Sequence, residues 1–426
     1  MQPDVLGLII LGICVVLFLT ERLPLAVTGC LGCLLMVLTR VASFQEVFSG
    51  FSSSIVLLMA STMIVGIAMF QTGAAQVIGK AIIRWSRGNE WIFLAVSCVV
   101  TGLASMFLAN TAILSAYIPI IDSVCTSSES MKRRNLTLPI SCAIMFGGAS
   151  TLVGCTPQLT ANGLMSQMVG KEMGMWTLTG PGLCLFALFL IFALTWGYRN
   201  SKRVWGQRPE VNMGLDENEH SKAQENGVNK KKLTIMFVII ILMIISYAFS
   251  LLPTAETAMC AAMLCVLTGC CHMRDIVKKL HWESVVFLAT CLGLAEGLTV
   301  AGSGELIEQT ASLALGKVAS PFLIFAVLTL LTLLISQFIT NSTALIIVLP
   351  VAFSLCEQYG FSYMPFCVGI TLAASIACCT PLAAAQITMT QVAGYEFSDY
   401  LKYGWLLSLV GYLGIMVFVP LFFPLV

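Results

Sequence analysis

One polar pattern occurs twice in this chain, as NTAILSAYIP at residues 110–119 and as NSTALIIVLP at residues 341–350. In each copy an asparagine precedes a proline by nine residues and follows a serine by five. A Cys-Thr-Pro sequence then follows each copy, at residues 155–157 and 379–381. Because these spacings recur in the same order, we predict that the chain contains two related halves.

The composition is that of a membrane protein. Of 426 residues, 58% are hydrophobic and only 10% are charged, and the mean hydropathy is +0.93. Soluble domains are about 45–50% apolar and about 25% charged, so a soluble enzyme and a disordered chain are excluded. The net charge of +1 offers no basic field for nucleic acid. We therefore expect an all-α polytopic membrane protein.

Apolar runs predict where this chain crosses the membrane. They lie at about 4–20, 23–39, 51–72, 92–124, 137–168, 176–196, 233–251, 254–270, 283–302, 320–356, 361–390 and 403–424. Since a spanning helix needs about 20 apolar residues, 92–124 and 320–356 are too long for one crossing. Each carries an asparagine near its middle and could be either two crossings or a re-entrant hairpin; the charge count does not distinguish these, and we take both as hairpins. Ten crossings remain, five in each half.

The distribution of positive charge predicts the orientation. With the N-terminus outside, nineteen of the 22 Lys and Arg residues fall on the cytoplasmic side. Such an excess is what the positive-inside rule requires. We therefore expect a multi-pass protein of the cell inner (plasma) membrane, with both termini extracytoplasmic.

The domain organisation follows from this count. A first repeat occupies residues 1–196 (hairpin about 92–124, broken helix about 137–168), a flexible cytoplasmic linker occupies 197–232, and a second repeat occupies 233–426 (hairpin about 320–356, broken helix about 361–390). Because each repeat has an odd number of crossings, the two insert in opposite senses. Inverted repeats with broken helices around one central site are typical of secondary transporters.

The polar residues of these segments predict an ion site. The hairpin tips offer Asn110, Thr111, Asn341, Ser342 and Thr343, and the helix breaks offer Gly154, Cys155, Thr156, Pro157, Cys379, Thr380 and Pro381. Hydroxyl, amide and free carbonyl oxygens suit Na⁺, whereas N–H groups at half-helix N-termini suit carboxylates. No Lys or Arg lies in a predicted membrane core. An anion would therefore be neutralised by helix dipoles and by co-bound cations.

Other ionisable groups give weaker signals. Glu296 is the one acidic residue predicted inside the membrane, and an ionisable group there is a candidate for proton or cation coupling, or else a structural hydrogen-bonding group. The seventeen cysteines are odd in number and mostly within apolar runs, so we expect no disulfide framework. The three histidines fall in polar connections without a metal-binding pattern.

These motifs resemble the divalent anion/sodium symporter family, which contains the dicarboxylate, citrate and sulfate transporters of the larger ion transporter superfamily. Hairpins of that family end in Ser-Asn-Thr, where this chain has Ala109-Asn110-Thr111 and Thr340-Asn341-Ser342. The resemblance covers nearly the whole chain. It implies an elevator mechanism, a homodimeric scaffold, and amphipathic arm helices around residues 77–85 and 306–313.

The resemblance also implies roles for individual residues. A first Na⁺ site would use Ser105, the Ala109 carbonyl, Asn110 and Gly154, and a second would use Ser336, the Ile339 carbonyl, Asn341 and the Cys379 carbonyl. Substrate carboxylates would meet Asn110, Thr111, Thr156, Asn341, Ser342 and Thr380. The expected function is Na⁺-coupled symport of a small divalent or trivalent anion, a C4-dicarboxylate or citrate.

Several alternatives stay open at this point. Ala109 lacks the hydroxyl that the family carries there, which keeps Na⁺-independent anion exchange as an alternative. A cation/proton or arsenite-type exchanger of the same superfamily is a second alternative, but we would expect it to have other intramembrane carboxylates besides Glu296. A channel would conduct without coupling. An embedded enzyme would need a nucleophile with a base, or a metal cluster, and the sequence offers neither at membrane depth.

Overall fold

The computed structural model describes residues 3–20, 23–73, 89–127, 131–205, 230–249, 251–302, 320–381 and 384–426, and it has no strand among them. The helices of the first half are α1 (Pro3–Thr20), α2 (Leu25–Leu38), α3 (Phe44–Val47), η1 (Ser49–Ser52), α4 (Ser54–Gln71), α6 (Glu90–Ser105), α7 (Asn110–Ser127), α8 (Arg133–Gly148), α9 (Thr156–Val169), α10 (Thr179–Phe192), η2 (Ala193–Gly197) and α11 (Tyr198–Trp205). Those of the second half are α13 (Lys230–Ala248), α14 (Thr254–Leu267), α15 (Met273–Lys279), α16 (Trp282–Val300), α18 (Pro321–Ile335), α19 (Asn341–Tyr359), α20 (Tyr363–Ser375), α21 (Ala385–Met389), η3 (Thr390–Ala393) and α22 (Phe397–Phe422). The all-helical class is as expected, and the segments predicted as arm helices, 77–85 and 306–313, lie outside the described residues.

Many of these helices are apolar enough to enter a membrane. Within the described ranges, five have the length and hydropathy to cross a bilayer: Thr179–Trp205, Lys230–Ala248, Trp282–Val300, Asn341–Tyr359 and Phe397–Phe422. Shorter apolar helices of 10–17 residues accompany them. Large apolar side chains also lie on the surface, among them Leu38, Phe249 and Leu267. Such a surface suits a lipid environment, in which helices satisfy their own backbone hydrogen bonds.

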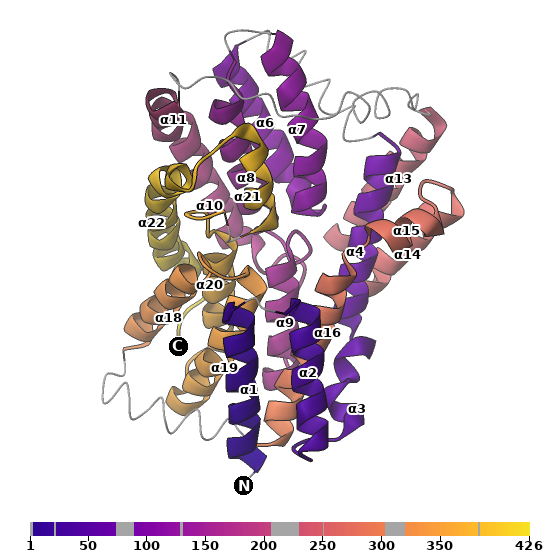
Figure 1. Cartoon of the computed structure of the whole chain (residues 1–426), viewed down its shortest axis with the longest axis vertical. Helices are drawn as coiled ribbons and strands as arrows, with labels where there is room; N and C mark the ends of the chain where they lie inside the picture. Colours follow the sequence, from indigo (N-terminus) through magenta and orange to yellow (C-terminus); the bar gives the residue numbers. More distant parts are fainter. Residues whose placement is uncertain are drawn as a thin grey trace.

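Each of the two long apolar segments forms a pair of helices. Residues 106–109 separate α6 from α7, and residues 336–340 separate α18 from α19, and the helices of each pair contact each other. Asn110 is the first residue of α7, and Asn341 is the first residue of α19. Figure 1 shows α6 and α7 toward one end of the molecule and α18 and α19 toward the other.

Two further segments are interrupted in mid-course. The buried helix α8 ends at Gly148, and α9 begins at Thr156 with a proline in its first turn, where the missing N–H removes no hydrogen bond. The buried helix α20 ends at Ser375, and α21 begins at Ala385. α8 packs on α6 and α7, and α20 packs on α18 and α19, so that each interrupted segment lies beside the helix pair of its own half.

Both ends of the predicted linker are helical. Its first residues continue the helix from Thr179 to Trp205, and its last three, residues 230–232, begin α13. Arg199, Lys202 and Arg203 make this region look solvated, but Ser201 and Trp205 on the other face are buried. The Trp205 ring lies 5.1 Å from that of Tyr395, centroid to centroid. Aromatic packing therefore extends the helix through a charged sequence.

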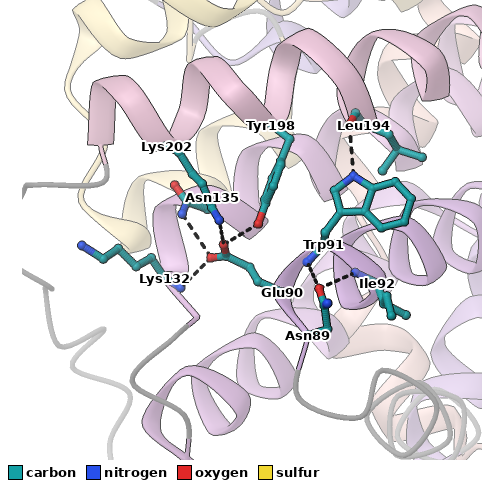
Figure 2. A network of polar contacts seen from close by, with 9 residues as sticks. All are labelled: Asn89, Glu90, Trp91, Ile92, Lys132, Asn135, Leu194, Tyr198 and Lys202. Carbon is teal, nitrogen blue, oxygen red and sulfur yellow. Dashed lines mark hydrogen bonds and ion pairs between the residues drawn. The ribbon is translucent and has the colours of Figure 1, made fainter.

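A buried carboxylate joins the start of α6 to two neighbouring helices (Figure 2). The Glu90 carboxylate accepts hydrogen bonds from the Lys132 backbone N–H at 3.0 Å, the Asn135 amide at 3.1 Å and the Tyr198 hydroxyl at 2.9 Å. The Lys202 ammonium lies 3.6 Å away. Because a buried carboxylate is costly unless it is hydrogen-bonded, these contacts fix α6, α8 and α11 relative to one another.

Candidate functional site

A cavity of about 280 Å³ lies where the helix pairs meet the interrupted helices. The cavity is lined by residues of both halves of the chain, and nine of the predicted site residues are among them: Ala109, Asn110, Thr111, Gly154, Cys155, Thr156, Pro157, Asn341 and Ser342. The members from the first half lie more than 180 positions before those from the second half in sequence. A volume of this size, near the lower end for ligand pockets, suits a small metabolite.

The first helix pair supplies a cluster of oxygen atoms beside the cavity. The Ser105 hydroxyl is hydrogen-bonded to Asn110 Oδ1 and also lies 2.7 Å from the backbone carbonyl oxygen of Ile144. Three oxygens thus share one hydroxyl proton, because an amide oxygen and a carbonyl can only accept. Ile144 lies one turn before the C-terminal end of α8, toward the negative end of the helix dipole. Such an arrangement favours a cation.

The second helix pair repeats this cluster. The Ser336 hydroxyl lies 2.7 Å from Asn341 Oδ1 and 3.0 Å from the backbone carbonyl oxygen of Ala374. Ala374 is the penultimate residue of α20, so its carbonyl, like that of Ile144 in α8, lies toward the C-terminal end of its helix. The same three kinds of oxygen therefore meet at the negative end of a helix in both halves.

Gly148 closes the first oxygen cluster. A Cβ atom placed on Gly148 would lie 2.6 Å from Asn110 Oδ1, 2.7 Å from Cys155 Sγ and 2.8 Å from Ser105 Oγ. Real Cβ atoms essentially never approach heavy atoms so closely. The Asn110 amide N–H donates to Cys155 Sγ at 2.9 Å, which ties the helix pair to the break after α8. The glycine is therefore required for the end of α8 to approach the start of α7.

Three helices have their N-termini at the cavity wall. The first residues of α7, α9 and α19 are Asn110, Thr156 and Asn341, and all three line the cavity wall. N–H groups of a first helical turn have no partner within their helix and carry partial positive charge. Among the described lining residues there is no Asp, Glu, Lys or Arg. The wall can therefore attract an anion through helix dipoles without fixed positive side chains.

Three predicted substrate residues are not among the described residues of the wall. Thr343 is buried, with its hydroxyl 2.7 Å from that of Thr340. Thr380 donates to the Gln337 carbonyl, as Thr151 in the first half donates to the Met106 carbonyl. By these hydrogen bonds, the residue of the first half that corresponds to Thr380 is Thr151 and not Thr156. Pro381 belongs to the same turn, and Ala384, Ala385 and Gln386 line the cavity in its place.

The backbone carbonyls predicted as cation ligands also differ from those at the oxygen clusters. The Ala109 carbonyl accepts hydrogen bonds from the N–H groups of Ala112 and Ile113, at 3.0 and 3.2 Å. Ile339 and Cys379 are buried, and the Cys379 N–H donates to Gln337 Oε1 at 2.8 Å. The carbonyls that reach Ser105 and Ser336 belong instead to apolar helical residues, which carry no side-chain signal in the sequence.

One wall of the cavity was missed altogether by sequence reasoning. It is formed by Leu25, Met59, Thr62, Met63, His281, Ser284 and Phe287, from α2, α4 and the start of α16. In the sequence His281 belongs to a polar connection, and nothing local connects it with residues 110 or 341. Glu296, the predicted coupling residue, is half-buried on α16 and is not among the described residues of the wall.

Comparison with known proteins places the chain in a family. A family model described as citrate transporter matches residues 15–330 and 308–426. The sodium-dependent dicarboxylate transporter SdcS of Staphylococcus saprophyticus is 24% identical over 424 residues, which covers 89% of this chain and 80% of that protein. The uncharacterized transporter sll0640 of Synechocystis is 27% identical over 187 residues. That match covers 44% of this chain but only 30% of the relative's own length.

The fold has a solved counterpart as well. The structure of MtrF from Neisseria gonorrhoeae, described as illuminating a class of antimetabolite efflux pumps, superposes with a TM-score of 0.62. It shares 12% sequence identity over 92% of this chain and 85% of that one, so the likeness concerns the fold alone. The resemblance to the divalent anion/sodium symporters is confirmed by the family match and by the named relatives. The chain belongs to the citrate transporter family, whose members are transporters and not enzymes.

Proposed function

We propose that this protein is a secondary active transporter that couples uptake of a small divalent or trivalent anion, a C4-dicarboxylate or citrate, to Na⁺ symport. The observation that carries the proposal is the pairing of two oxygen clusters with three helix N-termini around one cavity. Asn110 and Asn341 each contribute Oδ1 to a cluster and also line the cavity. Cations in the clusters and an anion in the cavity would therefore stabilise each other.

The two halves would act as inverted repeats in this proposal. The repeated geometry of Ser105–Asn110 and Ser336–Asn341 supports a pseudo-two-fold relation, as does the placement of the two helix pairs toward opposite ends of the molecule (Figure 1). The helix pairs and interrupted helices would form the mobile part of an elevator, and α1 to α4 and α13 to α16 the scaffold of a homodimer. Both termini would be extracytoplasmic.

Initial rates of labelled succinate uptake into proteoliposomes test the coupling. We expect an inward Na⁺ gradient to raise the rate about tenfold or more over an equal K⁺ gradient, because the coupling between sites is typically 5- to 150-fold. Empty liposomes are the control. Uptake that requires internal succinate and ignores Na⁺ would contradict symport.

Uptake that requires internal succinate but not Na⁺ would favour the Na⁺-independent exchanger. One feature of the chain supports this alternative. Ala109, beside the first cluster, carries no hydroxyl, whereas Thr340 at the matching position of the second half does. The first cluster therefore has one side-chain oxygen fewer near it than the second.

A further inference from the structure

The scaffold-side wall of the cavity contains a single side chain able to carry positive charge. Among the described residues that line the cavity, this side chain is His281. Every other polar group on the described wall is a hydroxyl, an amide, a thiol or backbone. An imidazole offers an N–H donor when neutral and two when protonated, so it can always donate to a carboxylate.

His281 is held in place by its backbone and by its neighbours. It is the residue before α16, and its carbonyl accepts hydrogen bonds from the N–H groups of Ser284 and Val285, at 3.0 and 3.4 Å. The next helix turn is fixed to α2, because Glu283 Oε1 accepts the Leu25 N–H at 3.1 Å. Trp282 donates its indole N–H to the Val277 carbonyl at 3.0 Å, which fixes α16 to α15.

The position of His281 is at the cavity mouth. Its side chain is exposed, whereas Asn110 and Asn341 on the opposite wall are buried. Leu25, which shares its wall, begins α2, and Ser284 lies in the first turn of α16; the positive-inside rule places both helix starts on the cytoplasmic side. An anion held by the hairpin tips would therefore pass His281 when it exchanges with the cytoplasm.

On this basis we propose that His281 is a substrate-binding residue of the cytoplasmic mouth: its imidazole N–H donates to the anion's carboxylate that faces away from the hairpin tips. The inference rests on the proposed transport function. Because His281 belongs to the opposite wall and lies at one mouth only, it sets the affinity for the anion on the cytoplasmic face and not on the outer face. It thereby makes the two faces unequal in a site that is otherwise built from matched halves.

The test compares the two faces of the membrane in the full-length protein. Labelled succinate uptake is measured in intact cells, which present the outer face, and in inside-out vesicles, which present the cytoplasmic face. His281→Phe keeps a planar ring without N–H groups, and His281→Lys keeps a cationic donor. His272→Phe is the matched control, since His272 is also an exposed residue preceding a helix, outside the described cavity wall.

We expect His281→Phe to raise the half-saturating succinate concentration roughly tenfold in inside-out vesicles, the low end for a hydrogen bond to a charged group. The maximal rate and the values in intact cells should change less than twofold, His281→Lys should restore the affinity, and His272→Phe should match wild type. An unchanged value in vesicles, or an equal change on both faces, would overturn the role of His281. Failure of the wild type to transport succinate would instead overturn the proposed function.

Discussion

Replacing Asn110 or Asn341 with alanine should each reduce Na⁺-driven succinate uptake roughly 100-fold, since losing one hydrogen bond to a charged group costs about 1.5–3 kcal/mol and each asparagine serves two ions. Asn110 Oδ1 belongs to the first oxygen cluster and Asn341 Oδ1 to the second. Each residue also begins a helix whose N-terminus lines the cavity. The measurement is the initial uptake rate in proteoliposomes at equal protein content.

A matched substitution separates this effect from general damage. Asn200→Ala changes an asparagine that is half-buried on α11 and not among the described residues of the cavity wall, and it should retain wild-type uptake. The two site variants should elute as the wild type does in gel filtration, because each loses only one short polar side chain. Wild-type uptake by both Asn110→Ala and Asn341→Ala would be incompatible with the proposed site.

A single methyl group at Gly148 should abolish uptake. In Gly148→Ala the new Cβ would meet Asn110 Oδ1, Ser105 Oγ and Cys155 Sγ, all at 2.6–2.8 Å. These three atoms are held by hydrogen bonds and sit in a buried site, so relieving the clash must open the first oxygen cluster. We expect Na⁺-driven uptake to fall to the level of empty liposomes, and overpacking of this kind costs about 1–3 kcal/mol of stability.

Gly12→Ala is the control for this prediction. Gly12 also lies within an apolar helix, but a Cβ atom added there meets nothing within 4 Å. It should therefore leave both uptake and the thermal unfolding midpoint close to those of the wild type. Unfolding monitored in detergent by intrinsic fluorescence shows whether Gly148→Ala remains folded, and a folded variant with wild-type uptake would contradict the close approach described above.

Much of this architecture could be predicted from the sequence, for physical reasons. The two helix pairs were predicted by apolar runs that are too long for one crossing and have an asparagine in the middle. A polar side chain is costly inside a lipid-spanning helix but is accepted at the start of a helix, so the asparagine marks a point where the helix is interrupted. The serine five residues before each asparagine pointed to the two places where the structure brings a serine and an asparagine oxygen together. These signals are local, so a linear sequence contains them.

Other parts could not be predicted because they depend on contacts between distant residues. The carbonyls of Ile144 and Ala374 reach the clusters through the backbone, which is the same for any residue type. The shared Cys-Thr-Pro sequence suggested that Thr380 matches Thr156, whereas its hydrogen bond to the Gln337 carbonyl corresponds to that of Thr151 with the Met106 carbonyl. His281 joins the cavity only through the packing of α16.

The central claim is that the anion and Na⁺ bind together between the two hairpin tips. Equilibrium binding of labelled succinate to the purified protein, with and without Na⁺ at constant ionic strength, tests it most directly. We predict that Na⁺ strengthens succinate binding to the wild type and that this gain is lost in Asn110→Ala and in Asn341→Ala, because linkage requires each ligand to favour the other. Succinate binding that is equally strong with and without Na⁺, or that keeps its Na⁺ dependence in both variants, would contradict the claim.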